Sequence, residues 1–274
     1  MKADKKLKQL GNVQQVVFTG NPPSFSRYLQ NVAEGLYLFN ENSMIDTDSI
    51  DEFDNGCVGK QAVNLIDNTG NSRVLWLVEL MKSKEDCSFF PGTLLRDFGG
   101  YVLPVMPVII NGKLVLERPK QTGIPLVDSY SELAKIFGGD AYAKDVETAL
   151  KKGTPFFVEP IKSLQENLER KVSSLRKDSL KSVQVNGLRV LPVICNEITS
   201  MPQSYQGEPI DVTLHASDSL FRTYGDMIEK YMGYFNKMGE NEKLNGPQVL
   251  VVAQDGENKF KGIFIYEKGE LIKA

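Results

Sequence analysis

The chain has 274 residues, and a hydrophobic content of 41% is enough to bury a sizeable core, which excludes wholesale disorder. The formal net charge of −3 argues against a dominant phosphate-binding face, so nucleic acid is not an expected partner. One histidine and three irregularly spaced cysteines do not make the Cys/His pattern of a zinc site, so we expect no metal.

The chain has no expected membrane span. Its longest purely apolar run, residues 101–110, is far shorter than the roughly 20 residues that a spanning helix needs. The basic N-terminal stretch has no apolar region of a secretion signal behind it. We therefore expect a cytoplasmic protein or a soluble domain, with membrane association only if the chain is part of a longer protein.

The first third of the chain contains two apolar segments that end near a glutamate. Residues 13–18 predict a strand, residues 24–39 have helical spacing and are followed by Glu41, and residues 40–71 predict an acidic loop excursion. Residues 74–80 (VLWLVEL) predict a strand that carries Glu79 near its end. A glutamate there either leaves the sheet or works in a site, because burial without a partner is costly.

The middle of the chain predicts a hairpin followed by helices. After a predicted helix at residues 90–98, strands at 101–110 and 113–117 flank Asn111-Gly112, a strong hairpin signal. Helical patterns cover 131–137, 144–152 and 158–180, so we expect a helical insertion over residues 139–182. The apolar stripe of 158–180 packs either on the parent domain or on a partner helix.

The last third reads as strand, sharp turn, short helix and strand. Residues 188–194 and 210–216 predict strands, a helix covers 223–238, and residues 249–253 and 263–266 predict two more strands. This order favours an α/β sandwich in a single domain over residues 1–274. No phosphate-cradling glycine loop is present, so no organic cofactor is implied.

Cys195 stands at the carboxyl end of the strand at 188–194. Because open α/β sheets place ligands at the carboxyl ends of strands, Cys195 is a candidate nucleophile. The alternative is a small buried apolar residue, a frequent fate of free cysteine. His215 lies inside a predicted strand without an obvious partner nearby in sequence, and we interpret it as a packed histidine.

Four segments resemble one known family. LRVLPVICNEITSMP (188–202) resembles the nucleophile turn of the carbon–nitrogen hydrolase (nitrilase) superfamily. Within that superfamily, its motif is most similar to that of the apolipoprotein N-acyltransferase branch. HASDSLF (215–221), ERPKQTGIPLVD (117–128) and the C-terminal VVAQDGENKFKGIFIYEKGEL (251–271) are similar to further segments of that family. The resemblance implies a nitrilase-like αββα sandwich.

The resemblance also implies a Glu-Lys-Cys triad. Cys195 matches the nucleophile, Lys120 the lysine that stabilises the oxyanion, and Glu79 the general base. Glu41, Asp128 and Glu197 are accessory or alternative carboxylates, and Glu41 is the rival base because the interval from Glu79 to Lys120 is short. A thiol becomes a useful nucleophile when a cation and a positioned base favour the thiolate.

These matches imply a cysteine-dependent amide hydrolase or N-acyltransferase that works through an acyl-thioester on a small amide or acyl substrate. A homodimer is expected from the family. Departures from the family pattern, such as Val78 before Glu79 and Asn196 after Cys195, leave two alternatives. One is a catalytically inactive nitrilase-like binding or assembly module, and the other is an unrelated α/β protein with a buried cysteine.

Overall fold

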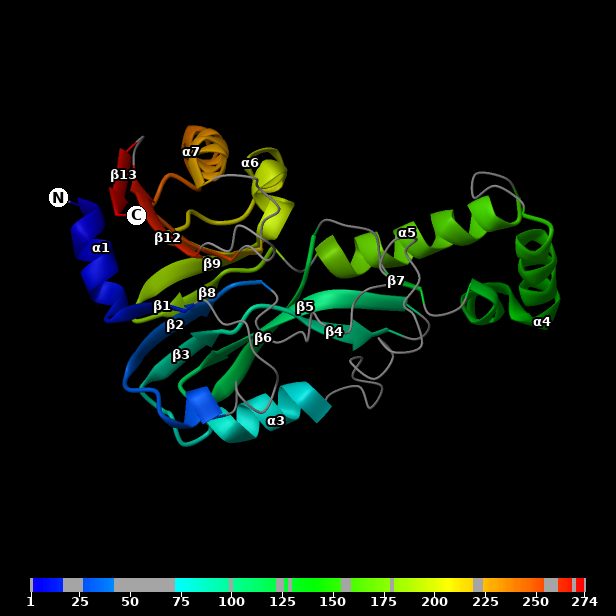
Figure 1. Cartoon of the computed structure of the whole chain (residues 1–274), viewed down its shortest axis with the longest axis horizontal. Coiled ribbons are helices and arrows are strands. Elements are labelled where there is room, and N and C mark those ends of the chain that lie inside the picture. The colour runs from blue at the N-terminus through cyan, green and yellow to red at the C-terminus, as the bar shows by residue number, and fades with distance from the viewer. Residues whose placement is uncertain are drawn as a thin grey trace.

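Figure 1 shows the computed structural model of the chain as two stacked sheets with helices outside them and a helical arm at one end. The structure describes residues 2–16, 27–41, 72–98, 101–121, 126–127, 130–153, 159–177, 180–218, 224–253, 261–267 and 270–273.

The first sheet is built from the N-terminal half of the chain. Its strands are β1 (Val13–Val16), β2 (Gly35–Phe39), β3 (Cys87–Phe90), β4 (Leu94–Asp97), β5 (Tyr101–Ile110), β6 (Lys113–Pro119) and β7 (Leu126–Val127). They follow the order β1-β2-β3-β5-β4, and β6 and β7 also pair with β5. Strands β1, β2 and β3 are parallel, so their carboxyl ends point the same way.

The second sheet is built from the C-terminal half. Its strands are β8 (Val183–Val185), β9 (Leu188–Ile194), β10 (Val212–Asp218), β11 (Gln248–Ala253), β12 (Lys261–Glu267) and β13 (Glu270–Lys273). Their order is β13-β12-β11-β10-β9-β8, and β9, β10 and β11 are parallel. The carboxyl end of β9 delivers Cys195, as the sequence predicts.

The two sheets pack face to face around a shared apolar core. Leu36, Leu38 and Phe90 of the first sheet meet Val190, Leu214 and Val251 of the second. Helix α3 (Ser72–Met81) covers the outer face of the first sheet, and α7 (Tyr224–Glu240) covers that of the second (Figure 1). The fold is therefore an αββα sandwich in a single domain, and the expected fold class is confirmed.

Several predicted elements are confirmed. Asn111 and Gly112 have φ angles of 52° and 70°, which is the left-handed pair that a tight two-residue hairpin requires. Short helices η4 (Cys195–Thr199) and α6 (Met201–Ser204) follow β9, and α7 lies where the sequence predicts a helix. Helix α1 (Lys2–Leu10) was not predicted, and it packs Leu10 into the core between the sheets.

Three predictions are wrong. Within the predicted helix at 24–39, only residues 27–30 are helical among those described, and Gly35–Phe39 is strand β2. The predicted strand at 74–80 is helix α3, and the predicted helix at 90–98 is replaced by the end of β3 and by β4. Short apolar runs carry no clear period, so strand and helix cannot be separated by periodicity there.

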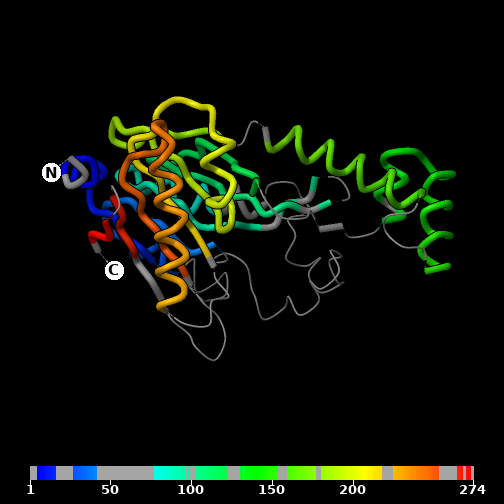
Figure 2. The backbone as a smooth tube through the Cα atoms, turned by 90° about the horizontal axis from the view of Figure 1, so that it is seen from above, coloured from blue at the N-terminus to red at the C-terminus, as the bar shows by residue number. Residues whose placement is uncertain are grey.

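The region of the predicted helical insertion belongs to an arm at one end of the sandwich (Figures 1 and 2). The arm consists of α4 (Tyr130–Lys151), broken at Gly139, and α5 (Ile161–Lys177). Leu164, Leu168 and Val172 of α5 are buried with Leu133 and Val146 of α4 and with Leu103 of β5. The apolar stripe thus packs on the parent domain rather than facing a partner. Across the described ranges, no helix is long and apolar enough to cross a membrane.

Candidate active site

Cys195 is the first residue after β9 and lies on a sharp strand-to-helix turn. Its φ angle is 49°, in the left-handed region that a residue with a side chain rarely adopts. Such strained positions cluster at functional sites. The thiol is half-buried and packs against the edge of the core between the sheets. The turn therefore presents the sulfur at the end of the sandwich where the parallel strands finish.

Glu41 and Lys120 lie beside this thiol, and both follow strands of the first sheet. Glu41 comes two residues after β2, and Lys120 directly follows β6. Lys120 Nζ is 2.5 Å from Glu41 Oε1, and the two side chains are 15% and 7% exposed. Thr93 fixes the backbone of Glu41, whose carbonyl accepts the Thr93 N–H at 2.6 Å and the Thr93 hydroxyl at 3.1 Å. The Glu41 carboxylate is also within hydrogen-bonding reach of the Cys195 thiol.

Burial, more than the neighbouring charges, keeps the resting thiol protonated. Burial and the neighbouring Glu41 carboxylate raise the pKa of Cys195 to about 12, although Lys120 opposes them. For Lys120, burial lowers the pKa, but the negative groups around it, with Glu41 foremost, outweigh burial and raise it. At neutral pH the site therefore holds a thiol beside an ammonium–carboxylate pair, and the thiol needs a base when it reacts.

Glu79, the preferred base of the sequence analysis, does not lie in this cluster. It projects from α3, its side chain is 76% exposed, and it pairs with Lys82 of the adjoining turn. Helix α3 buries Leu77 and Met81 against the outer face of the first sheet, which turns Glu79 outward. The structure therefore does not bring Glu79 together with Lys120, whereas Glu41, the alternative, lies beside it.

Glu197 is fully buried and joins the two segments that carry Cys195 and Lys120. Its Oε2 accepts the backbone N–H of Ile194 at 2.7 Å, and its Oε1 accepts the backbone N–H of Gln121. Arg118 Nη1 lies 2.7 Å from Glu197 Oε2, and both side chains are 0% exposed. Glu197 thus holds the residue before Cys195 and the residue after Lys120 through one carboxylate.

Arg118 was missed by the sequence analysis, although β6 contains a signal for it. Leu114, Leu116 and Arg118 alternate along this strand, so the arginine falls in the register that is partly or fully buried. A cation in that register requires an anionic partner. The sequence alone does not say which carboxylate supplies it.

The helical arm reaches the site through Arg176 of α5. Arg176 Nε donates to the backbone carbonyl of Lys120 at 2.8 Å, and Gln121 Nε2 donates to the carbonyl of Arg176 at 2.9 Å. The arm therefore also fixes the backbone that bears Lys120.

His215 is a packed histidine, as interpreted from the sequence. Its Nε2 lies 3.0 Å from Gln248 Oε1, and its ring meets Phe235 of α7 edge-on. Burial lowers the pKa of His215 to about 3, so the ring is neutral at physiological pH. Asp128 lies outside the described residues. Among the residues that are described, no group of three or more His, Cys, Asp and Glu side chains could hold a metal ion.

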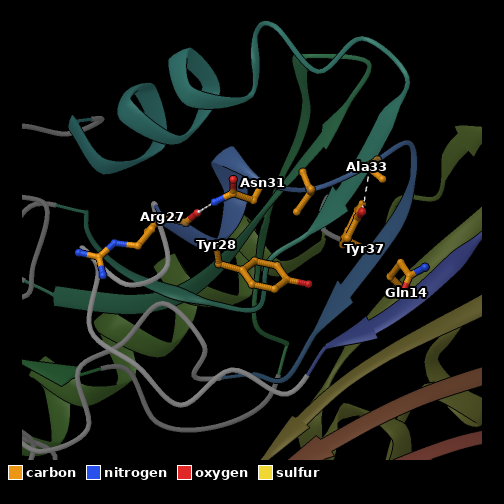
Figure 3. A pocket seen from close by; sticks show the side chains of 7 residues that line it. Gln14, Arg27, Tyr28, Asn31, Ala33 and Tyr37 are labelled. Atoms are coloured by element: carbon orange, nitrogen blue, oxygen red, sulfur yellow. Dashed lines mark hydrogen bonds between the residues drawn. The ribbon is translucent and has the colours of Figure 1, made fainter.

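A separate pocket lies at the edge of the first sheet. Figure 3 shows Tyr28, Tyr37 and Gln14 around it, with the Tyr37 hydroxyl bonded to the carbonyl of Ala33 at 2.8 Å. Its volume is about 610 Å³, and neither Cys195 nor Lys120 lines it. The pocket is therefore separate from the cluster of Cys195, Glu41 and Lys120.

Comparisons with known proteins identify the fold. No family model matches the chain, and no curated protein matches it in sequence. The structure of a carbon-nitrogen hydrolase from Helicobacter pylori G27 matches with a TM-score of 0.55 and 10% identity, over 95% of this chain and 82% of that one. The structure of Nit3 of Saccharomyces cerevisiae, a member of branch 10 of the nitrilase superfamily, matches with a TM-score of 0.52 and 11% identity. This match covers 95% of this chain and 83% of that one.

A glutamine-dependent NAD+ synthetase from Acinetobacter baumannii also matches, with a TM-score of 0.53 and 13% identity. The match covers 94% of this chain but 42% of the synthetase, so the chain spans less than half of that protein. At such identities the likeness shows the fold alone. The chain has the nitrilase-like sandwich of carbon-nitrogen hydrolases.

Proposed function

We propose that the chain is a cysteine-dependent enzyme that cleaves or transfers amide C–N bonds through an acyl-thioester. Cys195 is the nucleophile, Glu41 the general base and Lys120 the oxyanion-stabilising cation. The observation that carries the proposal is the contact of all three groups at the ends of β9, β2 and β6. Their meeting from two different sheets argues against a random cysteine and against an inactive module.

The first half-reaction follows from the protonation states. The Glu41 carboxylate accepts the thiol proton as the sulfur attacks the acyl carbon, so the nucleophile is activated only as the new S–C bond forms. The negative charge that develops on the acyl oxygen faces the Lys120 ammonium. Glu41 then returns the proton to the leaving amine as the C–N bond breaks, which leaves a thioester on Cys195.

The second half-reaction decides between hydrolysis and transfer. Glu41 takes a proton from water or from an acceptor amine, which attacks the thioester carbon and releases the Cys195 thiol. Attack by water gives a carboxylic acid, and attack by an amine gives a new amide. The resemblance of the Cys195 motif to the N-acyltransferase branch favours the amine. Product analysis with a primary amine added to the reaction distinguishes the outcomes, because transfer gives a new amide whereas hydrolysis gives the carboxylic acid.

The proposal is tested by turnover of simple acyl donors. Wild-type protein should release ammonia from members of a panel of primary amides and p-nitrophenol from p-nitrophenyl acetate. Cys195→Ser should abolish both, and Lys120→Met should slow both by about 10²–10³-fold, because the oxyanion loses its fixed partner. Release by Cys195→Ser at the wild-type rate, or no release by wild-type protein, would contradict the proposal.

A further inference from the structure

Ser217 stands next to Cys195 on the neighbouring strand. Strands β9 and β10 are parallel, with Ala216 opposite Ile194, so Ser217 and Cys195 are the next residues along each chain. Ser217 is 1% exposed. Its hydroxyl is within hydrogen-bonding reach of the Cys195 sulfur. The residue thus contacts the reacting atom from the second sheet, whereas Glu41 and Lys120 approach from the first.

Tyr231 of α7 holds this hydroxyl from behind. Ser217 Oγ is 2.5 Å from the Tyr231 hydroxyl oxygen. Tyr231 is 7% exposed, and its ring packs against Tyr234 and Phe235 of the same helix. A continuous line of polar atoms therefore runs from the outer helix layer through β10 to the thiol.

We propose that Tyr231 and Ser217 form a hydrogen-bond relay that donates to the Cys195 sulfur. The inference deepens the proposed function and rests on it. A thiolate has no proton to donate, so Ser217 must donate to it, and the Ser217 oxygen is then free to accept the proton of Tyr231. Ser217 is a catalytic residue in this account, and Tyr231 is a positioning residue that acts through it.

The relay completes the surroundings of the sulfur. The charged groups that face it in the described residues are Glu41 and Lys120, with Glu197 and Arg118 behind them. Glu41 accepts the proton of the thiol, whereas Ser217 donates to the charge that remains. A hydrogen bond to an ionised acceptor is stronger than a hydrogen bond to a neutral acceptor. The relay therefore stabilises the thiolate form of Cys195 more than the thiol form.

Thr213 provides a matched control. It lies on the same face of β10 as Ser217, is 0% exposed, and its hydroxyl has no hydrogen-bond partner among the described residues. Thr213→Val therefore removes a buried hydroxyl from the same strand without touching the relay.

The test is the rate at which iodoacetamide alkylates Cys195, followed on its peptide by mass spectrometry at several pH values near neutrality. Ser217→Ala should slow alkylation by about five- to tenfold, because the variant holds less thiolate at a given pH. The greater nucleophilicity of the remaining thiolate partly offsets this loss. Tyr231→Phe should slow it by about two- to threefold, and Ser217→Thr should restore it. Thr213→Val should leave it unchanged.

Alkylation of Ser217→Ala at the wild-type rate, or equal slowing by Thr213→Val, would overturn the relay. Thermal unfolding identifies any variant that does not fold, and Tyr231→Phe, which retains the ring, carries the test if Ser217→Ala fails to fold. Alkylation requires no acyl substrate. The relay can therefore fail while amide turnover persists, and turnover can be absent while the alkylation rates still respond to Ser217.

Discussion

Two glutamates follow apolar runs in the first third of the chain, and the structure gives them opposite surroundings. Glu41 follows β2, is 5% exposed and contacts Lys120. Glu79 lies on α3, and its exposed side chain reaches Lys82 of the adjoining turn. Strand β2 is buried on both faces, whereas α3 buries one face. A carboxylate becomes part of the site when its element ends between the sheets, not because an apolar run precedes it.

The largest expected effect is the difference in p-nitrophenol release between variants of these two glutamates. Glu41→Gln retains the shape of the side chain but removes the base, so p-nitrophenol release should fall by about 10²–10⁴-fold. Glu79→Gln should leave the rate unchanged, since its side chain faces solvent. Stopped-flow release from p-nitrophenyl acetate measures both. If Glu79→Gln lost p-nitrophenol release while Glu41→Gln kept the wild-type rate, Glu79 and not Glu41 would be the base.

The next largest effect concerns stability and compares a buried ion pair with a surface pair. Glu197→Ala leaves Arg118 without its anion in the protein interior, so we expect the free energy of unfolding to fall by about 3–5 kcal/mol. Lys82→Ala removes the surface partner of Glu79 and should cost less than about 1 kcal/mol. Urea unfolding measures both variants. Similar small losses would show that Arg118 is hydrated or has another partner.

The burial of His215 makes the stability of the protein depend on pH. Its pKa is lowered to about 3 in the folded protein by burial, whereas an unfolded histidine titrates near its ordinary value of about 6.5. The unfolded chain therefore binds the extra proton, and stability is lost as pH falls through this range, by about 1.4 kcal/mol per pH unit. His215→Gln should flatten that part of the profile in unfolding experiments. An unchanged profile would contradict the burial of a neutral ring.

The smallest expected effect tests the arm. Arg176→Gln removes the side-chain bond to the carbonyl of Lys120 and leaves the bond between Glu197 and the backbone of Gln121 in place. We expect acylation to slow by about two- to fivefold with little change in thermal stability, on the scale of one hydrogen bond. Lys171→Gln, an exposed position on the same helix, is the control. A loss as large as that of Lys120→Met would mean that the arm does more than support the backbone.

The sequence predicted the second sheet better than the first. Strand β9, the turn at Cys195, β10 and α7 follow a regular succession of apolar runs and turn residues, and the register of β9 against β10 places Ser217 beside Cys195. In the first half of the chain, GLYLF and VLWLVEL are both short and almost wholly apolar. Tertiary burial on two faces makes the first a strand, and burial on one face makes the second a helix.

The site was predicted in part for the same reason. Cys195 and Lys120 follow elements that were assigned correctly, and the structure places them in one cluster with Glu41. Glu79 was preferred because its element was assigned as a strand. The Arg118–Glu197 pair joins residues 79 positions apart in sequence, and only packing brings such residues together.

We propose that Cys195 carries the acyl group and that Glu41, not Glu79, allows the thioester to form. The most direct measurement is the mass of the Cys195 peptide after rapid acid quench of a reaction with p-nitrophenyl acetate. We expect an acetylated Cys195 peptide in wild-type protein and in Glu79→Gln, and little or none in Glu41→Gln at the same reaction time. An acetyl group on Cys57 or Cys87 alone, or equal acetylation of Cys195 in Glu41→Gln and wild-type protein, would contradict it.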